Sequence, residues 1–472
     1  MGAVLTVIFT ASNVYLGLKV GLTFSSAIPA AVISMAVLRM AKGSNILENN
    51  MVQTQASAAG TLSAIIFIVR LIGAGAMGVA AIWTLIKLAR PVIDGVKEAI
   101  QSARVPQEER KQHRTDTDMS VRTIAIIFMI MFASLLGTFY SLVSANNLPF
   151  AQSMIISLVG VLLAVMVGFL VAAACAYMAG LVGTASSPIS GIGILAIIIS
   201  SLVIMTLCKL LGIFDMPGGE KFATATAIFT TSIVIAIACI SNDNMQDLKT
   251  GFLVGATPQR QQIALLLGCL AGALVIAPVL NLLYQAYGFQ GALPRPDMNP
   301  DNALAAPQAT LMTMIAQGIF SSNIAWEYIY FGIEFGVVVV IIDSILKSQT
   351  KNLCLPPLAV GIGIYLPPSL QTPLVVGAIL GYLLEKKMSS QSKETVEASK
   401  RRGTLFSSGL IVGESLVGVI IAAIIAVSVS GGGSDSPLAL VGDGFASTAE
   451  FLGLGVFAAT LAIFYKMVRG KA

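Results

Sequence analysis

Two short polar segments, residues 48–57 and 242–250, interrupt an otherwise apolar chain. Their amide side chains are able to donate hydrogen bonds to the backbone of a peptide-like solute and to accept hydrogen bonds from it. Asparagine and glutamine also join membrane helices through cross-helix hydrogen bonds, and this structural role is the alternative. The amides expected to contact such a solute are Asn49, Asn50, Gln53, Gln55, Asn242, Asn244 and Gln246.

The same segments carry carboxyl groups that are candidates for proton coupling. A charged side chain near the bilayer centre costs at least about 2.5–3.5 kcal/mol, and burial favours the neutral, protonated form of a carboxyl group. The candidates are Glu48, Asp243 and Asp247, the last two of which share one helical face because they are four residues apart. Asp343 precedes Lys347 by the same spacing, which favours a structural ion pair.

These polar groups lie in a chain with the composition of a membrane protein. Of its 472 residues, 56% are hydrophobic and 11% are charged, whereas a soluble domain has about 25% charged residues. A bilayer core about 30 Å thick requires about 20 apolar residues in a helix, and a helix satisfies its own backbone hydrogen bonds. The alternation typical of a membrane β-barrel is not visible. The sequence therefore predicts an all-α, polytopic membrane protein.

Apolar runs of sufficient length predict the helices and their orientation. The predicted helices lie at about residues 2–18, 22–41, 121–144, 151–179, 190–212, 222–240, 261–285, 328–347, 404–430 and 448–467, and shorter or broken apolar stretches lie at about 46–69, 71–89, 303–321 and 356–384. Lysine and arginine gather in the loops 88–120 and 385–403. By the positive-inside rule, both loops and the C-terminus are expected in the cytoplasm.

One apolar stretch, residues 355–384, is interrupted by prolines at positions 356, 357, 367, 368 and 373. It is too short for two full spans, which need about 40 residues, and proline breaks helical hydrogen bonding. A re-entrant pair of half-helices, or two short spans, is one interpretation. A single kinked helix is the other.

Similar patterns recur in the same order in two parts of the chain. Tyr15, Gly17 and Gly21, followed by Ser25, Ser26 and Pro29, are echoed by Tyr177, Gly180 and Gly183, followed by Ser186, Ser187 and Pro188; residues 49–53 are echoed by residues 242–246. This favours a duplicated unit with halves 1–145 and 146–472, although chance similarity between small-residue helices is the alternative. Interruptions at matching places in two halves indicate a transporter binding site. They add Tyr15, Ser186 and Ser187 to the candidate substrate ligands.

Other functions have weaker support. The cysteines at positions 175, 208, 239, 269 and 354 stand singly, without disulfide or zinc spacing, and the only histidine, His113, lies in a charged loop. No metal site, cofactor or catalytic residue is expected, so a membrane-embedded enzyme is a minor alternative, as is a channel. The net charge of +5 belongs to the predicted cytoplasmic loops, and no nucleic-acid partner is expected.

Several blocks of the sequence resemble the oligopeptide transporter family. They lie at residues 13–21, 28–35, 46–60, 180–191, 242–251 and 355–367, and they include Asn13-Val14-Tyr15-Leu16-Gly17, Glu48-Asn49-Asn50-Met51-Val52-Gln53 and Asn242-Asp243-Asn244-Met245-Gln246. The resemblance implies about sixteen helices from a duplicated unit that moves small peptides or metal chelates with protons. It also adds Asn13 to the candidate substrate ligands.

The protein expected from the sequence is a prokaryotic secondary transporter in the plasma membrane, with about 12–16 transmembrane helices, some of them broken or re-entrant. Proton-coupled symport of small oligopeptides is the favoured function, and metal-chelate uptake, as implied for relatives of the yellow-stripe-like carriers, is the alternative. The expected partners are the solute, protons, the lipid bilayer and, in a homo-oligomer, a second copy. Val69 runs into Arg70 without turn residues, where the family has further helices. Either this is a shortened homologue or residues are missing around 69–70.

Overall fold

In the residues that the computed structural model describes, the regular structure is helical apart from isolated β-bridges that join Phe289 to Ala292 and to Leu304. The structure describes residues 11–12, 15, 73, 75–80, 82–84, 86, 114–146, 148–182, 189–289, 292–296, 298, 303–304, 306–321, 326–350, 354–365, 368–388, 391–441 and 445–469. The α-helices are α5 (Val121–Ser144), α6 (Phe150–Val182), α7 (Ile189–Leu210), α8 (Gly219–Val254), α9 (Pro258–Tyr287), α10 (Pro307–Ser321), α11 (Trp326–Gln349), α12 (Pro357–Tyr365), α13 (Pro368–Met388), α14 (Lys393–Ser430) and α15 (Ala446–Arg469); short 3-10 helices lie at Arg114–Asp116 and Ile213–Asp215.

Within the described ranges, 8 helices are long and apolar enough to cross a membrane. The prediction of an all-α, polytopic membrane protein is therefore confirmed. The total of 12–16 spans stays a prediction, as does the duplication of the unit. Residues 355–384 form two helices, α12 and α13, on either side of residues 366–367, and their re-entrant course also stays a prediction.

Local signals set several helix ends. The hydroxyl oxygens of Ser120 and Ser392 accept hydrogen bonds from the backbone N–H groups of Thr123 (3.2 Å) and Thr395 (3.3 Å), which caps α5 and α14. Helix α8 ends at Gly255, whose φ of 76° suits glycine and whose N–H donates to the carbonyl of Gly251. These signals carry α8 and α14 well beyond the apolar cores that the sequence predicted.

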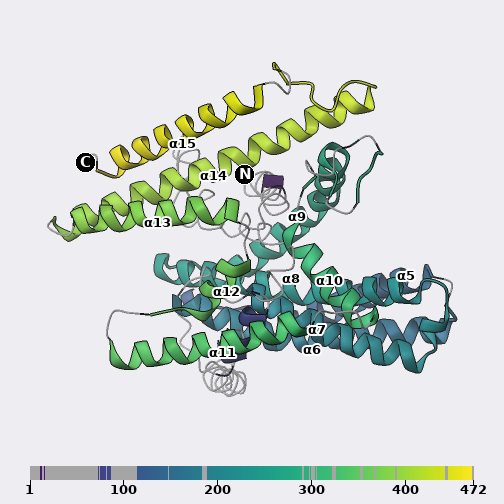
Figure 1. Ribbon diagram of the computed structural model, residues 1–472. Helices are drawn as coiled ribbons and strands as arrows, with labels where there is room; N and C mark the ends of the chain where they lie inside the picture. Colours follow the sequence, from purple (N-terminus) through teal and green to yellow (C-terminus); the bar gives the residue numbers. More distant parts are fainter. Residues whose placement is uncertain are drawn as a thin grey trace.

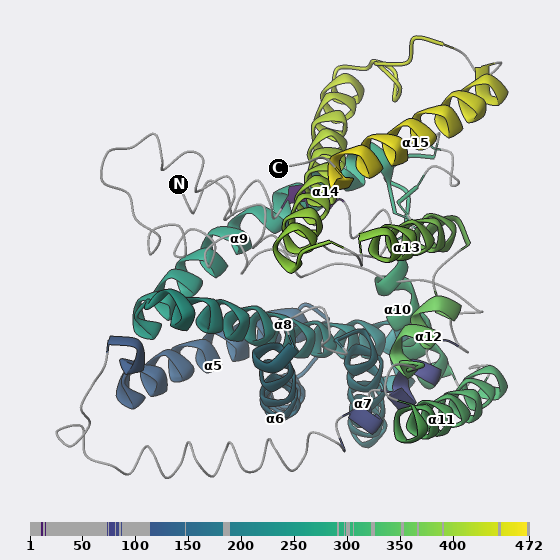
Figure 2. The same ribbon diagram turned by 90° about the vertical axis from the view of Figure 1, so that its left-hand side faces the viewer.

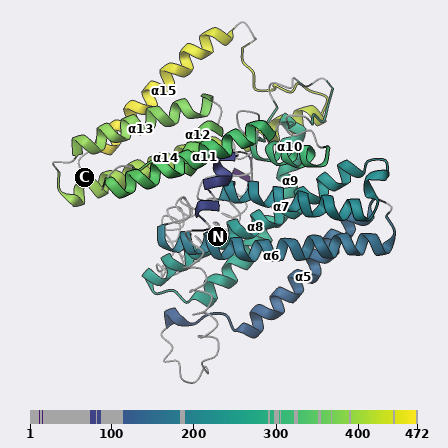
Figure 3. The ribbon, with the colours of Figure 1, turned by 60° about the horizontal axis from the view of Figure 1, so that its bottom comes forward.

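The helices form two layers connected by α9. Figures 1 and 2 place α13, α14 and α15 on one side of the molecule and α5 to α8 on the other. Figure 3 shows α5, α6, α7 and α8 side by side, and α6 and α7 both pack against α8. Helix α9 contacts α8 and α14, so it reaches both layers.

The predicted ion pair between Asp343 and Lys347 is confirmed, with 2.6 Å between the carboxylate and the ammonium group. The other carboxylate oxygen of Asp343 accepts from the backbone N–H of Leu355 at 3.0 Å. Asp343 therefore also ties the segment before α12 to α11.

Two kinds of surface meet on the layer of α5 to α8. Phe139 of α5 is fully buried, lies edge-on to Phe229 of α8 with 4.8 Å between ring centroids, and occupies the space beside Gly160 of α6. Phe169 of α6, by contrast, is 61% exposed on a helix that is apolar enough to span a membrane. The first ring packs a protein core, and the second is placed to face lipid.

Replacing Phe139 with Ala is expected to destabilise the folded protein by about 3–5 kcal/mol, because it leaves a cavity between three helices. Phe169→Ala is the matched control. It is expected to have a small effect, because lipid or detergent fills the space that the ring leaves. Thermal unfolding of both variants in the same detergent measures the difference, and equal losses would contradict the assignment of the two surfaces.

Candidate functional site

The second polar segment forms a continuous part of helix α8, and residues 242–247 are called the α8 polar segment below. The sequence predicted that the helix ends at residue 240, but α8 continues to Val254. Asn242 is 1% exposed and Asp247 is 0% exposed. Asp243, Asn244 and Gln246 are half-buried, and Met245 faces outward. The segment therefore carries amides and carboxyl groups into protein surroundings at the end of a candidate span.

A glutamine that the sequence reasoning missed completes this site. Gln261 of α9 is fully buried, and its side-chain N–H donates to the backbone carbonyl of Asp247 at 2.8 Å. It fits because the facing residue is Gly251: a methyl group added there would overlap the Gln261 amide. The signal in the sequence was the glycine in a family-like block, together with three glutamines at the start of the next helix, at positions 259, 261 and 262.

The start of α9 is also tied to the segment that precedes α5. The backbone N–H of Gln259 donates to the carbonyl of Thr117 at 3.0 Å. The Gln262 side chain donates to the carboxylate of Asp118 at 3.1 Å and accepts from the backbone N–H of Met119 at 3.2 Å. The α8–α9 turn and the start of α5 therefore lie at one end of the bundle.

The end of α6 lies against the α8 polar segment. A Cβ atom added at Gly180 would be 3.2 Å from the side chain of Met245, so the small residue permits this close approach. Two of the blocks that resemble the oligopeptide transporter family thus meet here, at residues 180 and 245. The serines predicted as ligands, Ser186 and Ser187, follow α6 in sequence but lie outside the described residues.

Asn244 offers a free acceptor. Within the part of the chain that the structure describes, its side-chain oxygen is buried and has no hydrogen-bond partner. A buried carbonyl oxygen without a partner is costly, and a bound solute or water with a suitable N–H or O–H group relieves that cost. Of the predicted ligands in α8, Asn244 is therefore the best placed to accept from a solute.

Tyr15 lies elsewhere. It is 6% exposed and packs against Tyr287 of α9, with 6.2 Å between ring centroids, and against Gly418 of α14. Residues 261 and 287 are separated by about 39 Å along a helix that rises 1.5 Å per residue. The structure therefore does not bring Tyr15 to the α8 polar segment. The other predicted site residues lie outside the described residues: Asn13, Glu48, Asn49, Asn50, Gln53, Gln55, Ser186 and Ser187.

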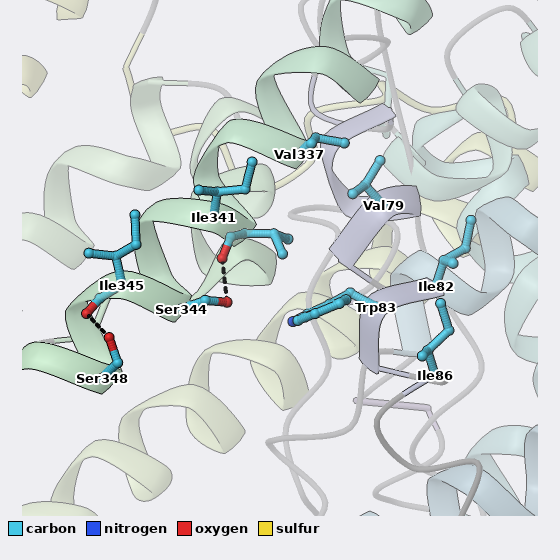
Figure 4. A pocket seen from close by; sticks show the side chains of 10 residues that line it. Val79, Ile82, Trp83, Ile86, Val337, Ile341, Ser344, Ile345 and Ser348 are labelled. Atoms are coloured by element: carbon cyan, nitrogen blue, oxygen red, sulfur yellow. Dashed lines mark hydrogen bonds between the residues drawn. The ribbon is translucent and has the colours of Figure 1, made fainter.

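Two sizeable cavities are found away from this segment. One, of about 590 Å³, lies between residues 79–86 and α11 and is lined mainly by apolar side chains, with Trp83 on one wall (Figure 4). The hydroxyl groups of Ser344 and Ser348 both donate to carbonyl groups of α11 itself. The walls of this cavity therefore offer little to a polar solute. The other cavity, of about 730 Å³, lies between α13, α14 and α15.

The described residues contain no group of three or more His, Cys, Asp or Glu side chains arranged to hold a metal ion. Cys175, Cys208 and Cys239 are buried among helices. Their burial fits the interpretation that they serve as small apolar residues.

The sequence profile of the "OPT oligopeptide transporter protein" family matches residues 1–72 and 68–425. The chain belongs to this family. The predicted resemblance is therefore confirmed. Because the OPT family is a family of transporters, not of enzymes, the chain is a multi-pass membrane transporter.

Individual relatives agree with this membership. A Haemophilus influenzae protein that carries the name oligopeptide transporter is 39% identical over 627 aligned positions, which cover 96% of this chain and 99% of the relative. A Saccharomyces cerevisiae protein of the same description is 25% identical over 50% of this chain and 29% of its own length. A rice protein named as a metal-nicotianamine transporter is 20% identical over 42% of this chain and 26% of its own length. No solved structure matches the chain.

The fit between Gly251 and Gln261 predicts a glycine requirement in this OPT protein. Gly251→Ala is expected to displace the Gln261 amide from the carbonyl of Asp247 and to lower both thermal stability and transport. Gly137→Ala is the matched control, because nothing lies within 4 Å of its added methyl group. It is expected to stabilise α5 by about 1 kcal/mol or less. Thermal unfolding together with uptake assays measures both effects, and a neutral Gly251→Ala would contradict the packing described.

Proposed function

We propose that this OPT protein is a secondary active transporter that takes up small oligopeptides together with protons across the plasma membrane of a bacterium. The observation that carries the proposal is the α8 polar segment, where buried amides and carboxyl groups share one end of a candidate span with Gln261 of α9. Polar groups that are expensive in a membrane and lie between helices are typical of solute and proton pathways.

The solute would be recognised through its backbone. A peptide presents alternating N–H donors and carbonyl acceptors, which the amides of Asn242, Asn244 and Gln246 complement in both directions. In this proposal the segment 48–57 supplies a second set of amides from Asn49, Asn50, Gln53 and Gln55. Asn13, Ser186 and Ser187 of the other family-like blocks complete the proposed site, whereas Tyr15 is left out because it packs against Tyr287 and Gly418.

Protons would be coupled through Asp243, Asp247 or Glu48. A carboxylate in protein surroundings is costly when it is charged, so proton uptake from the more acidic side stabilises the closed, solute-loaded state. Release of the proton on the other side restores the charge and favours reopening. Burial of Asp247 and half-burial of Asp243 support this role.

Metal-chelate uptake is a second candidate, because rice relatives named as metal-nicotianamine transporters match 42% and 43% of this chain. A chelate carries its own ligands for the metal, so the protein needs no metal-binding cluster to transport it. Peptide uptake is preferred here because the Haemophilus influenzae relative, which matches 96% of the chain, carries the oligopeptide transporter name.

The arrangement of the chain in the membrane is part of the proposal. The loops 88–120 and 385–403 and the C-terminus are placed in the cytoplasm, the halves are 1–145 and 146–472, and a homo-oligomer is allowed. We also propose that the first half is incomplete around residues 69–70. Two findings support this: the family match is broken at residues 68–72, and the 627-position alignment is longer than the 472-residue chain.

The carboxyl groups of α8 provide the test of coupling. In proteoliposomes, uptake of labelled peptide by the unaltered protein is expected to rise when an inward proton gradient is imposed. The double variant Asp243→Asn, Asp247→Asn is expected to lose this gradient dependence while it keeps exchange of bound solute, because the proton-binding groups are removed and their shape is kept. The control is Asp116→Asn, Asp215→Asn, which removes two exposed carboxylates. Gradient-driven uptake that survives in the α8 variant would exclude the assigned role.

Competition experiments distinguish the two substrates. A mixture of di- to tetrapeptides is expected to inhibit uptake of a labelled peptide at concentrations where ferric nicotianamine has no effect, because the amides of the α8 polar segment complement peptide bonds. The reverse order of inhibition, with the chelate as the stronger competitor, would favour the second candidate.

A further inference from the structure

The cavity between α13, α14 and α15 is lined by both apolar and polar residues, and it is not part of the proposed transport site. The lining residues Leu384, Ile411 and Phe464 are apolar and are called its apolar wall below. The lining also includes Ser407 and Ser408, on the same helix as Ile411. Its volume of about 730 Å³ is that of a small-molecule site. A ligand with one polar and one apolar end fits such walls.

The end of the three helices beside this cavity is strongly basic, while the charged residues that line the cavity itself are Lys400 and Glu385. The cations in the described residues 385–402 and 466–469 are Lys386, Lys387, Lys393, Lys400, Arg401, Arg402, Lys466 and Arg469, against the carboxylates of Glu385, Glu394 and Glu397. Eight cations against three carboxylates leave a net charge of +5 at one end of three apolar helices. Basic clusters at the membrane end of a helix attract anionic lipid headgroups.

The cations differ in the protein groups that already bind them. Arg402 joins the helices, since one of its terminal nitrogens donates to the Ser399 hydroxyl at 3.1 Å and to the carbonyl of Val468 at 3.5 Å. Lys400 pairs with Glu385 of α13 at 2.6 Å, but both side chains are more than half exposed, at 57% and 59%. An exposed ion pair contributes little to stability. Lys400, the cation among the lining residues, is therefore able to exchange its carboxylate for another anion.

The order of groups along α14 matches the order of groups in a phospholipid. Lys400 lies nearest the basic end of α14, Thr404 lies about one helical turn further along, and Ser408 and Ile411 follow at about one turn each. One turn corresponds to about 5.4 Å. A phosphate at Lys400 would thus leave the ester groups near Thr404 and the acyl chain along Ser408, Ile411 and Phe464.

We propose that this cavity binds one anionic phospholipid, with its phosphate at Lys400 and one acyl chain along the apolar wall. A free phosphate ion would leave the apolar wall unused. A zwitterionic lipid would bring a positive headgroup into a cluster with a net charge of +5. The proposal is independent of the substrate, because the cavity does not include the α8 polar segment.

Photo-crosslinking in proteoliposomes tests it. The protein is reconstituted with a trace of photoactivatable phosphatidylglycerol or phosphatidylcholine that carries the reactive group on the acyl chain, close to the ester. After illumination the protein is digested, and the fragments that carry crosslinked lipid are identified by mass spectrometry. Labelling of α13 and α14 at the cavity is expected to be several-fold stronger with phosphatidylglycerol. Lys400→Gln is expected to reduce this labelling several-fold. Ser408→Leu, which fills the cavity without a change in charge, is expected to reduce it as well.

Lys249→Gln is the matched control, because it removes one exposed cation from α8 and is expected to leave the labelling unchanged. Each variant is first compared with the unaltered protein by size-exclusion chromatography and thermal unfolding. Equal labelling by the two lipids would overturn the proposal, as would labelling that neither Lys400→Gln nor Ser408→Leu reduces. Loss of labelling on addition of inorganic phosphate at constant ionic strength would also overturn it, because the site would then be a phosphate site.

Discussion

Every backbone N–H and C=O group inside a bilayer must find its partner within the protein, and the rest of this structure depends on that constraint. It makes the spans helical whatever their side chains are. It also explains how hydroxyl side chains are accommodated: Thr226, Thr230 and Thr231 of α8 each donate to the carbonyl four residues earlier, at 2.8–2.9 Å. Such side chains are satisfied by their own helix and are available to little else.

A carboxylate has no donor for such a bond, and an amide that makes it, as Asn146 does with the carbonyl of Leu142, still has an oxygen that needs a donor, which is why the α8 polar segment stands out. The Gln261 side chain instead reaches the backbone of a neighbouring helix. Between helices, such a contact is strong only if the helices approach closely, and Gly251 provides that approach. The small residues and the polar residues of the family-like blocks therefore belong to one arrangement: the former allow the packing that the latter require.

Much of the fold could be predicted because span length and hydropathy are properties of consecutive residues. Helix α5 begins and ends where the apolar run 121–144 does, and the Asp343–Lys347 pair follows from a spacing within one helix. Helices α8 and α14 were predicted too short, because hydropathy falls at residues 241–254 and 393–403 while helical hydrogen bonding continues through them. The Ser392 cap was the local signal for the earlier start of α14.

The site was harder to predict, because it depends on which helices meet. The polar pattern of the sequence identified residues 242–247 but gave no reason to expect a contact with Gln261. The repeated pattern grouped Tyr15 with this segment, although Tyr15 packs at the other end of α9. Helix α9 connects these two places, and it contains Pro278 between them. Proline removes one helical hydrogen bond, so a helix bends more easily there. In the proposed transport cycle, α9 would transmit a movement of the α8 polar segment to the Tyr15–Tyr287–Gly418 contact. It would do so only while the helix does not bend at Pro278.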